Sequence, residues 1–415
     1  MLGGGAREHA LCRCLADDPE VSALACAPGN AGTAALAQTL PVDLSDPVAV
    51  ADLAVGWGAD LVVVGPEAPL VAGVADAVRA RGIDCFGPSR QAARLEGSKA
   101  FAKDVMAAAG VPTAMAHVCD TAAQAAAALD AFGPPYVVKD DALAAGKGVL
   151  VTDDRDAALA HAAACGRVVI EEFLDGPEVS LLCVTDGTDI VALHPAQDFK
   201  RLADGDVGPN TGGMGAYCPL PWAGPSLADD VVERVVRPTV EELARRGTPF
   251  VGVVYAGLAL TPKGVRVIEF NARFGDPETQ VVLARLRTPL AGLLRAAATG
   301  RLAQAEPLRW SEGAAVAVVV AAPGYPAAPR TGDPVTGLDE AGHEEGCWVL
   351  HAGTADVGGT VLSSGGRVLS VVGTGPDLAT ARDRAYRAVA HIALAGGQYR
   401  TDIAAAAVAD EIVVP

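Results

Sequence analysis

The feature that most constrains this chain is the alternation of short apolar runs with helical stretches through roughly its first hundred residues. The apolar runs "VSALACAPG", "ADLVVVGPE" and "IDCFGPS" end in Gly or Pro turns, and "DPVAVADLAVGWG" and "LVAGVADAVRARG" separate them. Such alternation predicts βαβ units and a parallel sheet. Because ligands gather at the carboxyl ends of parallel strands, the loops "GGGAREH", "APGNAG", "GPEAPL" and "FGPS" are candidate ligand loops.

The start of the chain departs from a nucleotide-binding fold in two ways. Only Met1 and Leu2 precede Gly3, so we expect the first strand of this sheet to be missing, which would destabilise the domain. The glycine loop is also a poor dinucleotide fingerprint, because Glu8 stands where the third glycine belongs. An oxidoreductase function is therefore not favoured.

Charge and cysteine usage restrict the class of protein. The 415 residues include 32 Lys and Arg against 50 Asp and Glu, a net charge of −18, which argues against a nucleic-acid-binding surface. The nine cysteines are scattered without zinc-site spacing, which is typical of reduced thiols in a cytoplasmic protein. We find no membrane-length apolar run and no signal peptide after Met1, and we expect a soluble intracellular protein.

The rest of the chain indicates further domains. From Lys99 onward, the helical segments "SKAFAKDVMAAAGVPT", "TAAQAAAALDAFG" and "RDAALAHAAACG" flank the strands "PPYVVK" and "RVVIEEFLDGPEVSLLCVTDG". Residues 190–218 are expected to be loop-rich. A long helix, "SLADDVVERVVRPTVEELARRG", then precedes two antiparallel strands, "FVGVVYAGLAL" and "GVRVIEFNARFGDPETQ". From about residue 311 strands return around one helix, "DLATARDRAYRAVAHIAL".

The segment "KDDALAAGKGVLV" resembles an anion-binding loop. Lys139 ends an apolar strand and Lys147 lies between two glycines, so backbone amides and two ammonium groups can cradle an anion. The loop is not a Walker A motif, because Asp141 replaces its first glycine. The alternative is a surface loop with solvated lysines. The next segment, "IEEFLDGPE", favours a nucleotide, because it offers acceptors for an adenine amino group and, at Glu178, a carboxylate for ribose hydroxyls.

The strand "VIEFNARFGDPE" indicates a metal site. Side chains alternate along a strand, so Glu269, Asn271 and Arg273 face the same side. A carboxylate and an amide oxygen suit Mg²⁺, which takes a few protein oxygens together with substrate phosphates. Arg273 is then placed to neutralise a transferring phosphoryl group. The alternative is the solvated face of a sheet.

Two polar loops, the second of them glycine-rich, lie between these segments. The loops "QDFKR" and "GDVGPNTGGMGAY" contain Asp198, Lys200, Arg201, Asp206, Asn210 and Thr211. A long polar loop of this kind can cover a substrate and exclude water from a reactive intermediate. The alternative is a mobile surface loop.

Together these segments resemble the phosphoribosylamine–glycine ligase family. The matching motifs are, in the family's order and over nearly the whole chain, "AREHAL", "APGNAGT", "VGPEAPL", "FGPS", "LEGSKAFAK", "LAAGKGV", "VIEEFLDGPE", "GPNTGGMGAY", "VIEFNARFGDPETQ" and "RTGD". The resemblance implies a cytoplasmic ATP-grasp ligase of purine biosynthesis that joins glycine to 5-phosphoribosylamine through glycyl phosphate. It also implies a monomer or weak homodimer.

The fold class that the resemblance implies is α/β, and α+β in part. An N-terminal doubly wound parallel-sheet domain would occupy residues 1–98 and an ATP-grasp domain residues 99–310. The latter would contain a small lid subdomain at about 111–168, and a β-rich C-terminal domain would occupy residues 311–415.

The resemblance also implies a set of site residues. ATP would be bound by Lys103, Lys139, Lys147, Glu171, Glu172, Phe173, Leu174 and Glu178. Mg²⁺, with Mn²⁺ as the alternative ion, would be bound by Glu269 and Asn271. Glycine and phosphoribosylamine would meet Gly29, Asn30, Pro66, Glu67, Lys200, Asn210, Thr211, Gly213, Met214, Arg273 and Asp276. The catalytic residues would be Arg273, Lys147 and Asp198.

Four positions differ from the family pattern: Ala6 for glycine, Asp140 for alanine, Ala142 for glycine and Phe199 for histidine. If Asp140 pointed at the phosphates from about 6 Å, the repulsion would be roughly 3 kcal/mol at an effective dielectric near 20. Ala142 would be strained if its backbone needed a positive φ. Two other functions therefore stay open: another ATP-grasp ligase or carboxylase of purine metabolism, and a nucleotide-binding homologue with impaired catalysis.

Overall fold

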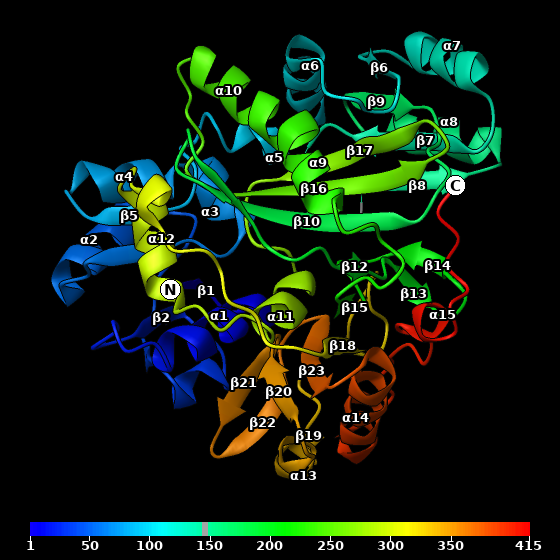
Figure 1. Cartoon of the computed structure of the whole chain (residues 1–415). Coiled ribbons are helices and arrows are strands. Elements are labelled where there is room, and N and C mark those ends of the chain that lie inside the picture. The colour runs from blue at the N-terminus through cyan, green and yellow to red at the C-terminus, as the bar shows by residue number, and fades with distance from the viewer. Residues whose placement is uncertain (143–147) are drawn as a thin grey trace.

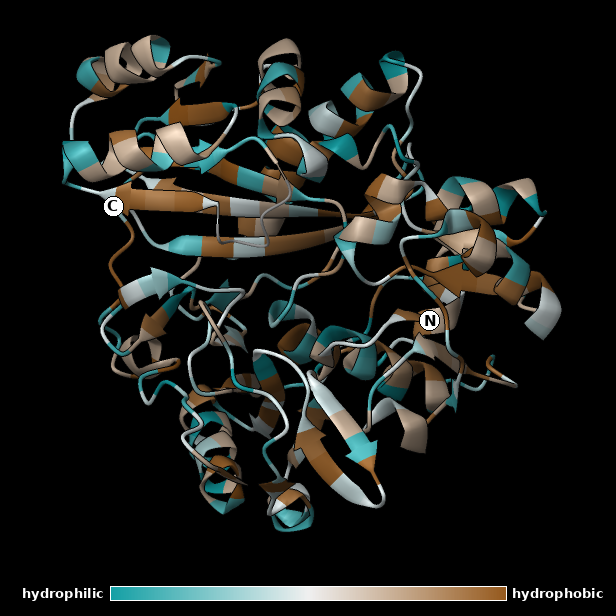
Figure 2. Ribbon diagram, turned by 180° about the vertical axis from the view of Figure 1, so that it is seen from behind, coloured by the Kyte–Doolittle hydropathy of each residue, from teal (hydrophilic) through white to brown (hydrophobic). Residues whose placement is uncertain are grey.

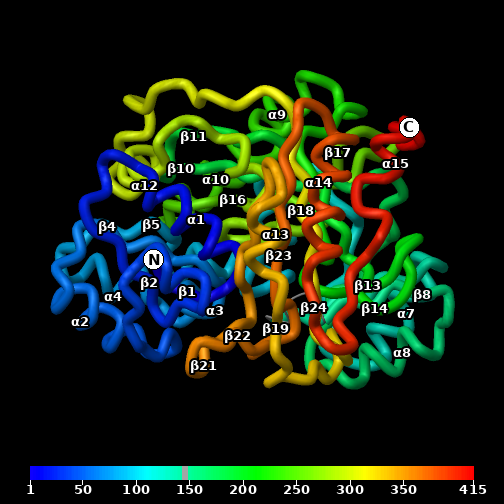
Figure 3. The backbone as a smooth tube through the Cα atoms, turned by 90° about the horizontal axis from the view of Figure 1, so that it is seen from below, coloured from blue at the N-terminus to red at the C-terminus, as the bar shows by residue number. Residues whose placement is uncertain are grey.

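The structure, a computed structural model, describes residues 1–142 and 148–415. Three regions pack around a common centre (Figure 1): an N-terminal parallel sheet, two antiparallel sheets in the middle of the chain, and a C-terminal sheet covered by a long helix. Seen from below, the C-terminal strands and helix run across the middle of the molecule beside the N-terminal sheet (Figure 3). Within the described chain, no helix is long and apolar enough to cross a membrane.

The N-terminal region contains the predicted alternation of strands and helices. Its strands are β1 (Leu2–Gly3), β2 (Ala25–Pro28), β3 (Gln38–Thr39), β4 (Leu61–Val63) and β5 (Asp84–Phe86). Its helices are α1 (Ala6–Ala16), α2 (Pro47–Trp57), α3 (Glu67–Ala72), α4 (Val74–Ala80) and α5 (Arg94–Gly97). The strand pairs are parallel, as predicted. Local signals fix the helix ends: the Asp46 carboxylate caps α2, which stops at Gly58 in a left-handed conformation.

The expectation that the first strand is missing is wrong. β1 has only two residues, but Leu2 pairs with Ala27 of β2 on one side and bridges Val64, just after β4, on the other. Leu2 is buried, and its carbonyl accepts a hydrogen bond from the Gly65 amide at 3.0 Å. The short strand therefore joins the two halves of the sheet, because it is central and bonded on both edges.

The middle of the chain begins with helix α6 (Lys99–Ala109) and a small four-stranded sheet in the order β6-β9-β7-β8. Its elements are β6 (Ala116–Cys119), α7 (Ala122–Phe132), β7 (Tyr136–Asp140), β8 (Val149–Thr152), α8 (Arg155–Ala164) and β9 (Val168–Glu171). The segment predicted as one strand, residues 167–187, is two strands in different sheets. The predicted strand is interrupted by a bend at Gly176, where an added Cβ would overlap the Leu260 carbonyl.

The second sheet of this region has the order β11-β10-β16-β17. It consists of β10 (Glu178–Thr185), β11 (Ile190–Ala192), β16 (Gly252–Thr261) and β17 (Gly264–Asn271). β16 and β17 are antiparallel, as predicted, with an irregularity between Gly257 and Leu258. The strands of this sheet are largely apolar (Figure 2). The predicted long helix consists of α9 (Leu227–Val231), a π-helical segment (Val232–Val236) and α10 (Arg237–Arg245).

Residues 190–218, expected to be loop-rich, carry several short strands. These are β12 (Gln197–Asp198), the hairpin β13 (Arg201–Ala203) and β14 (Val207–Asn210), and β15 (Gly215–Cys218). β12 and β15 continue the C-terminal sheet, whose order is β12-β15-β18-β23-β20. That sheet is therefore built from both sides of the predicted boundary at residue 311, and the domain limits stay a prediction.

The remaining elements follow the segment "VIEFNARFGDPE", which was predicted to bind a metal. Helices α11 (Glu278–Leu283) and α12 (Leu290–Ala298) lead to β18 (Ala314–Ala321), β19 (Val335–Thr336), α13 (Leu338–His343), β20 (Cys347–His351), β21 (Thr354–Val357), β22 (Thr360–Ser363), β23 (Arg367–Gly375), α14 (Leu378–His391), β24 (Ala393–Leu394) and α15 (Ala405–Val408). All eight residues of β18 are buried, which places this strand in the core between sheet partners and α14.

Candidate active site

Two of the predicted phosphate-binding lysines meet at one buried carboxylate. Glu171, at the end of β9, is 3% exposed and lies 3.1 Å from Lys103 Nζ and 2.9 Å from Lys139 Nζ. Lys139 also donates to the Ile268 carbonyl of β17 at 2.9 Å. Burial lowers the pKa of Lys103, although the Glu171 carboxylate opposes this change. The small sheet is thus attached to the strand that carries the predicted metal ligands.

The predicted adenine segment follows directly. The Glu172 carboxylate accepts a hydrogen bond from the Met115 amide at 2.9 Å and lies 3.4 Å from Arg266. Phe173 is 44% exposed and Leu174 is half-buried. Since both Glu171 and Glu172 bond protein groups, we expect the exposed Phe173 ring and the segment's backbone, rather than these two carboxylates, to be available for a base.

The unusual residues of the lysine loop are accommodated locally. The Asp140 carboxylate accepts from the Ala142 amide at 3.3 Å, which stabilises the turn. Ala142 is not among the described non-glycine residues with positive φ, so its backbone is not strained. The Asp141 carboxylate accepts from the Ala100 amide at 2.8 Å. Lys147, predicted to bind phosphate and to act in catalysis, lies outside the described residues.

The oxygens of Glu269 and Asn271 fit a hard metal ion. Both residues are half-buried on β17, two positions apart. Within residues 1–142 and 148–415, neither side chain has a protein hydrogen-bond or ion-pair partner, and no cluster of three His, Cys, Asp or Glu forms a metal site. Two oxygen donors without a protein cage are the arrangement that Mg²⁺ uses when substrate phosphates complete its coordination.

Arg273 lies between two carboxylates from the N-terminal region. Its Nε is 3.3 Å from Glu67 Oε2, and its Nη2 is 3.1 Å from Glu96 Oε1. Burial would lower the pKa of Arg273, but Glu96 and Glu67 raise it well above its ordinary value. Burial would raise the pKa of Glu67, yet Arg273 and Arg7 lower it. Arg273 therefore stays a cation, and a substrate phosphate would share it with Glu67 and Glu96.

A second charged cluster contains the pair Asp198 and Lys200. Lys200 Nζ lies 2.5 Å from Glu178 Oε2 and 3.1 Å from Asp198 Oδ1. Burial raises the pKa of Asp198 to about 7, and the charges of Glu278 and Glu178 add to this effect while Lys200 opposes it. Burial would lower the pKa of Lys200, but Asp198 and Glu178 hold it well above its ordinary value. Asp198 can thus exchange a proton near neutral pH.

Sequence reasoning missed a buried network beside this pair. Glu278 is 2% exposed, and its Oε1 accepts from Tyr255 Oη at 2.5 Å and from Ser180 Oγ at 3.2 Å. Burial raises the pKa of Tyr255 well above its ordinary value, with Glu278 contributing. Glu278 ends the motif "FGDPE", so its position in that motif was the available signal.

The predicted N-terminal substrate loops adjoin one another. Asn30 Nδ2 donates to the Gly4 carbonyl at 3.0 Å and to the His351 carbonyl at 2.7 Å, and Asn30 Oδ1 accepts from two amides of its own turn. The Asn30 side chain is therefore occupied by protein groups. Gly29 has a φ of +73°, and Pro66 precedes α3, the helix that begins with Glu67.

The residues of the glycine-rich loop "GDVGPNTGGMGAY" that were predicted to bind substrate contact protein groups. Thr211 is buried and bonds the Lys200 carbonyl, and Asn210 Nδ2 donates to the Val149 carbonyl at 3.4 Å. The Met214 side chain is completely buried against Ala321 and Tyr325, so only its backbone is left for the predicted substrate contact.

Asp276 pairs with Arg367 at 2.9 Å. Burial would raise the pKa of Asp276, but Arg367 and Arg7 hold it below its usual range. Asp276 is therefore an anion at neutral pH.

Comparisons with known proteins show which family this chain is similar to. Family models match the phosphoribosylglycinamide synthetase N domain at residues 1–96, its ATP-grasp (A) domain at residues 97–279 and its C domain at residues 315–406. The chain is 70% identical over 409 residues to a phosphoribosylamine–glycine ligase of Streptomyces coelicolor, covering 98% of each chain.

Two solved structures are similar to this chain, one at the level of the family and one at the level of the fold. The crystal structure of phosphoribosylamine–glycine ligase from Thermotoga maritima is similar with a TM-score of 0.83 and 33% identity, covering 97% of this chain and 98% of that one. A biotin carboxylase domain from Hydrogenobacter thermophilus, solved with MgADP, has a TM-score of 0.68 at 18% identity, covering 96% of this chain and 91% of that one. The second likeness concerns the fold alone.

Proposed function

This chain belongs to the phosphoribosylglycinamide synthetase family, and we propose that the described site supports each step of that family's ligation. The enzyme has the expected α/β ATP-grasp fold and joins glycine to 5-phosphoribosylamine with ATP in purine biosynthesis. The observation that carries the assignment of the site is the attachment of Lys103, Lys139 and Glu171 to β17. This strand also carries the oxygens of Glu269 and Asn271, which have no partner among the described residues.

The family uses ATP and a divalent metal. We propose that the metal is Mg²⁺, with Mn²⁺ as an alternative, and that Glu269 and Asn271 hold it. A bound Mg²⁺ would neutralise phosphate charge during phosphoryl transfer. Lys103 and Lys139 would bind the phosphates by exchanging part of their contact with Glu171. From its place in the loop motif, Lys147 would bind them as well.

In the first half-reaction the glycine carboxylate attacks the γ-phosphorus of ATP, ADP leaves, and glycyl phosphate forms. This step needs positioning and charge neutralisation more than proton transfer. Arg273 is suited to charge neutralisation, because its neighbouring carboxylates Glu67 and Glu96 fix it in place and keep it protonated.

In the second half-reaction the amine of phosphoribosylamine attacks the acyl carbon, the carbon–oxygen bond to phosphate breaks, and the nitrogen loses a proton. We assign that proton to Asp198, because this carboxylate is buried beside Lys200 and titrates near neutral pH. The substrates would lie between Glu67 and Asp276, near the loops that contain Gly29 and Gly213.

The proposal also covers the oligomeric state, the location and the competing functions. We propose a monomer or weak homodimer that acts on small molecules in the cytoplasm, where the nine free cysteines, six of them fully buried within the fold at 3% exposure or less, stay reduced. The other ATP-grasp functions considered above are not favoured, because the family models match nearly all of the chain. Impaired catalysis is not favoured either, because Asp140 and Ala142 fit their turn.

Glu269→Gln tests the metal site. We expect this variant to lose Mg²⁺-dependent turnover and to lose Mn²⁺ binding in the presence of ADP, measured by the paramagnetic resonance of free Mn²⁺, because a carboxylate ligand is replaced by a neutral amide. Glu241→Gln, an exposed residue of α10, is the matched control and should bind as the unchanged enzyme does. Normal Mn²⁺ binding by Glu269→Gln would remove Glu269 from the metal site.

A further inference from the structure

Arg367, the first residue of β23, is far in sequence from every motif used above, yet its guanidinium reaches two loops of the site. Nη1 donates to the Gly212 carbonyl at 2.5 Å and to the Asp276 carbonyl at 2.8 Å, and Nη2 lies 2.9 Å from Asp276 Oδ2. The planar guanidinium thus joins β23 to the loop of Gly212 and to the segment of Asp276. Its rigid fork fixes their relative position in a way that a single ammonium group does not.

The loop held by Arg367 has little freedom to move. The Gly212 amide donates to Tyr325 Oη at 2.9 Å, so C-terminal residues bond both the amide and the carbonyl of Gly212. Gly213 has a φ of +107°, and a Cβ there would overlap Pro277. The loop therefore packs against the segment that carries Asp276 with no room for a larger residue.

Asp276 also lies where the N-terminal region meets the site. A Cβ added to Gly5 would be 3.6 Å from Asp276 Oδ2, and the neighbouring Gly4 carbonyl is bonded by Asn30. Asn30 belongs to the loop assigned to phosphoribosylamine. The groups that Arg367 fixes therefore adjoin the amine-substrate end of the site.

The ATP end is held by separate contacts. Lys103 and Lys139 bond Glu171, and Lys139 reaches the Ile268 carbonyl. Among the residues that the structure describes, none of these groups bonds Arg367. A change at Arg367 should therefore affect the two ends of the site unequally.

We infer that Arg367 is a positioning residue for the second half-reaction. It holds the Gly212–Gly213 backbone and Asp276 around phosphoribosylamine, so that the amine reaches glycyl phosphate before water does. This inference rests on the proposed function. If the loop loosens, water attacks glycyl phosphate instead, the bond to phosphate breaks, and glycine and phosphate form. ATP is then consumed without amide formation.

Arg367→Met in the full chain tests the inference. ADP and glycinamide ribonucleotide are measured in the same reaction with freshly made phosphoribosylamine. We expect the KM for phosphoribosylamine to rise by roughly tenfold or more, since small misplacements of reacting groups have effects of this size. The KM for ATP should stay unchanged, and the ratio of ADP to product should rise above one. Arg330→Met, which removes an exposed ion pair with Asp333 in the same region, should keep the ratio at one.

Two results would overturn the inference: an unchanged KM for phosphoribosylamine with a ratio of one, or equal losses for all three substrates. If Arg367→Met does not fold, Arg367→Lys replaces it. Lysine retains the charge beside Asp276 but cannot make all the carbonyl bonds, so the ratio should again exceed one, and a ratio of one would contradict the inference. Failure of the unchanged enzyme to turn over with both substrates would instead contradict the proposed function.

Discussion

Glu8 determines what the first glycine loop can bind. Its carboxylate accepts a hydrogen bond from the Gly5 amide at 2.6 Å, and a Cβ on Gly65 would overlap it. Glu8 therefore stands at the position of the third glycine, which dinucleotide-binding loops use for close packing of the helix on the strand, and its side chain fills that space. The sequence predicted this exclusion from the missing glycine, and the structure supplies its physical cause.

Asp198 leads to a prediction of pH dependence. Its pKa is raised to about 7, mainly by burial. If the ionised carboxylate accepts the proton of the amine, kcat should fall as the pH drops below about 7, because protonated Asp198 cannot accept it. The Asp198→Asn variant should lose roughly a hundredfold in kcat together with this acidic limb. The measurement is the pH profile of kcat at saturating substrates for both proteins.

The variant profile decides the role of Asp198. If Asp198→Asn kept both the rate and the acidic limb, another group would accept the proton. A loss of rate with an unchanged limb would limit Asp198 to orienting Lys200, which lies 3.1 Å away.

At the scale of elements, the sequence predicted those whose signals are local. The parallel alternation of residues 1–98 and the β16–β17 hairpin were visible because periodicity and turn residues lie within a few positions of each other. The two-residue β1 and the short strands of residues 197–218 were not visible. β1 and β15 exist because strands distant in the sequence pair with them, and such pairing leaves no local pattern. β13 and β14 pair with each other in a short hairpin whose polar residues lack the alternation that predicts strands.

The same distinction applies to the site. Lys103, Lys139, Glu269 and Asn271 could be proposed because motifs contain them, although their roles stay predictions. Arg367 and Arg400 lie outside every motif that carries chemistry. Only the fold shows that these two C-terminal arginines reach loops of the site.

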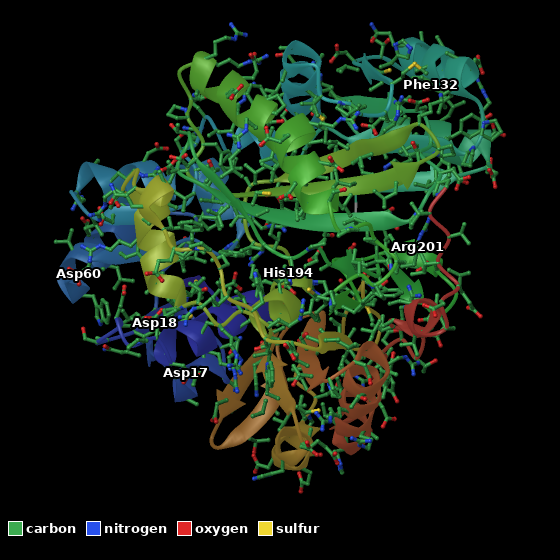
Figure 4. The ribbon with its side chains drawn as sticks, in the orientation of Figure 1. Asp17, Asp18, Asp60, Phe132, His194 and Arg201 are labelled. Carbon is green, nitrogen blue, oxygen red and sulfur yellow. The ribbon has the colours of Figure 1, made fainter. Side chains whose placement is uncertain are left out.

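The β13–β14 hairpin depends on such a distant contact. Arg400 is 1% exposed, and it lies 2.5 Å from Asp206, 2.7 Å from Asp402 and 4.9 Å from the Phe199 ring. The Asp402 carboxylate also accepts from the Gly205 amide at 2.8 Å. Arg201, labelled in Figure 4, lies on this hairpin, and its carbonyl accepts from Arg400 at 3.2 Å.

We expect Arg400→Met to release this hairpin and to lower the free energy of unfolding by roughly 2 kcal/mol, since a buried cation is removed from partly exposed carboxylates. Hydrogen exchange should become faster at the amides of residues 201–210. Arg387→Met, which removes solvent-exposed contacts with Asp383 and Glu344, is the control and should cost less than about 0.5 kcal/mol. Unchanged exchange in the hairpin would show that Arg400 does not hold it.

At the scale of the whole molecule, the three regions contribute to one site. The N-terminal region supplies Glu67 and Glu96, which fix Arg273 of the middle region, and the C-terminal region supplies Arg367, which fixes Asp276. Because both pairs bridge regions, we expect the two half-reactions to depend on how the regions pack together. Under the proposed roles, coupling of ATP use to amide formation requires the assembled chain.

The release of ADP by the purified 415-residue chain tests this account most directly. ADP is measured with ATP, Mg²⁺ and glycine, in the presence and absence of freshly made phosphoribosylamine. We predict sustained turnover only when both substrates are present, with one ADP for each glycinamide ribonucleotide formed. Turnover that ignores either substrate, or ATP binding without turnover, would contradict the assignment of a coupled ligase to this site.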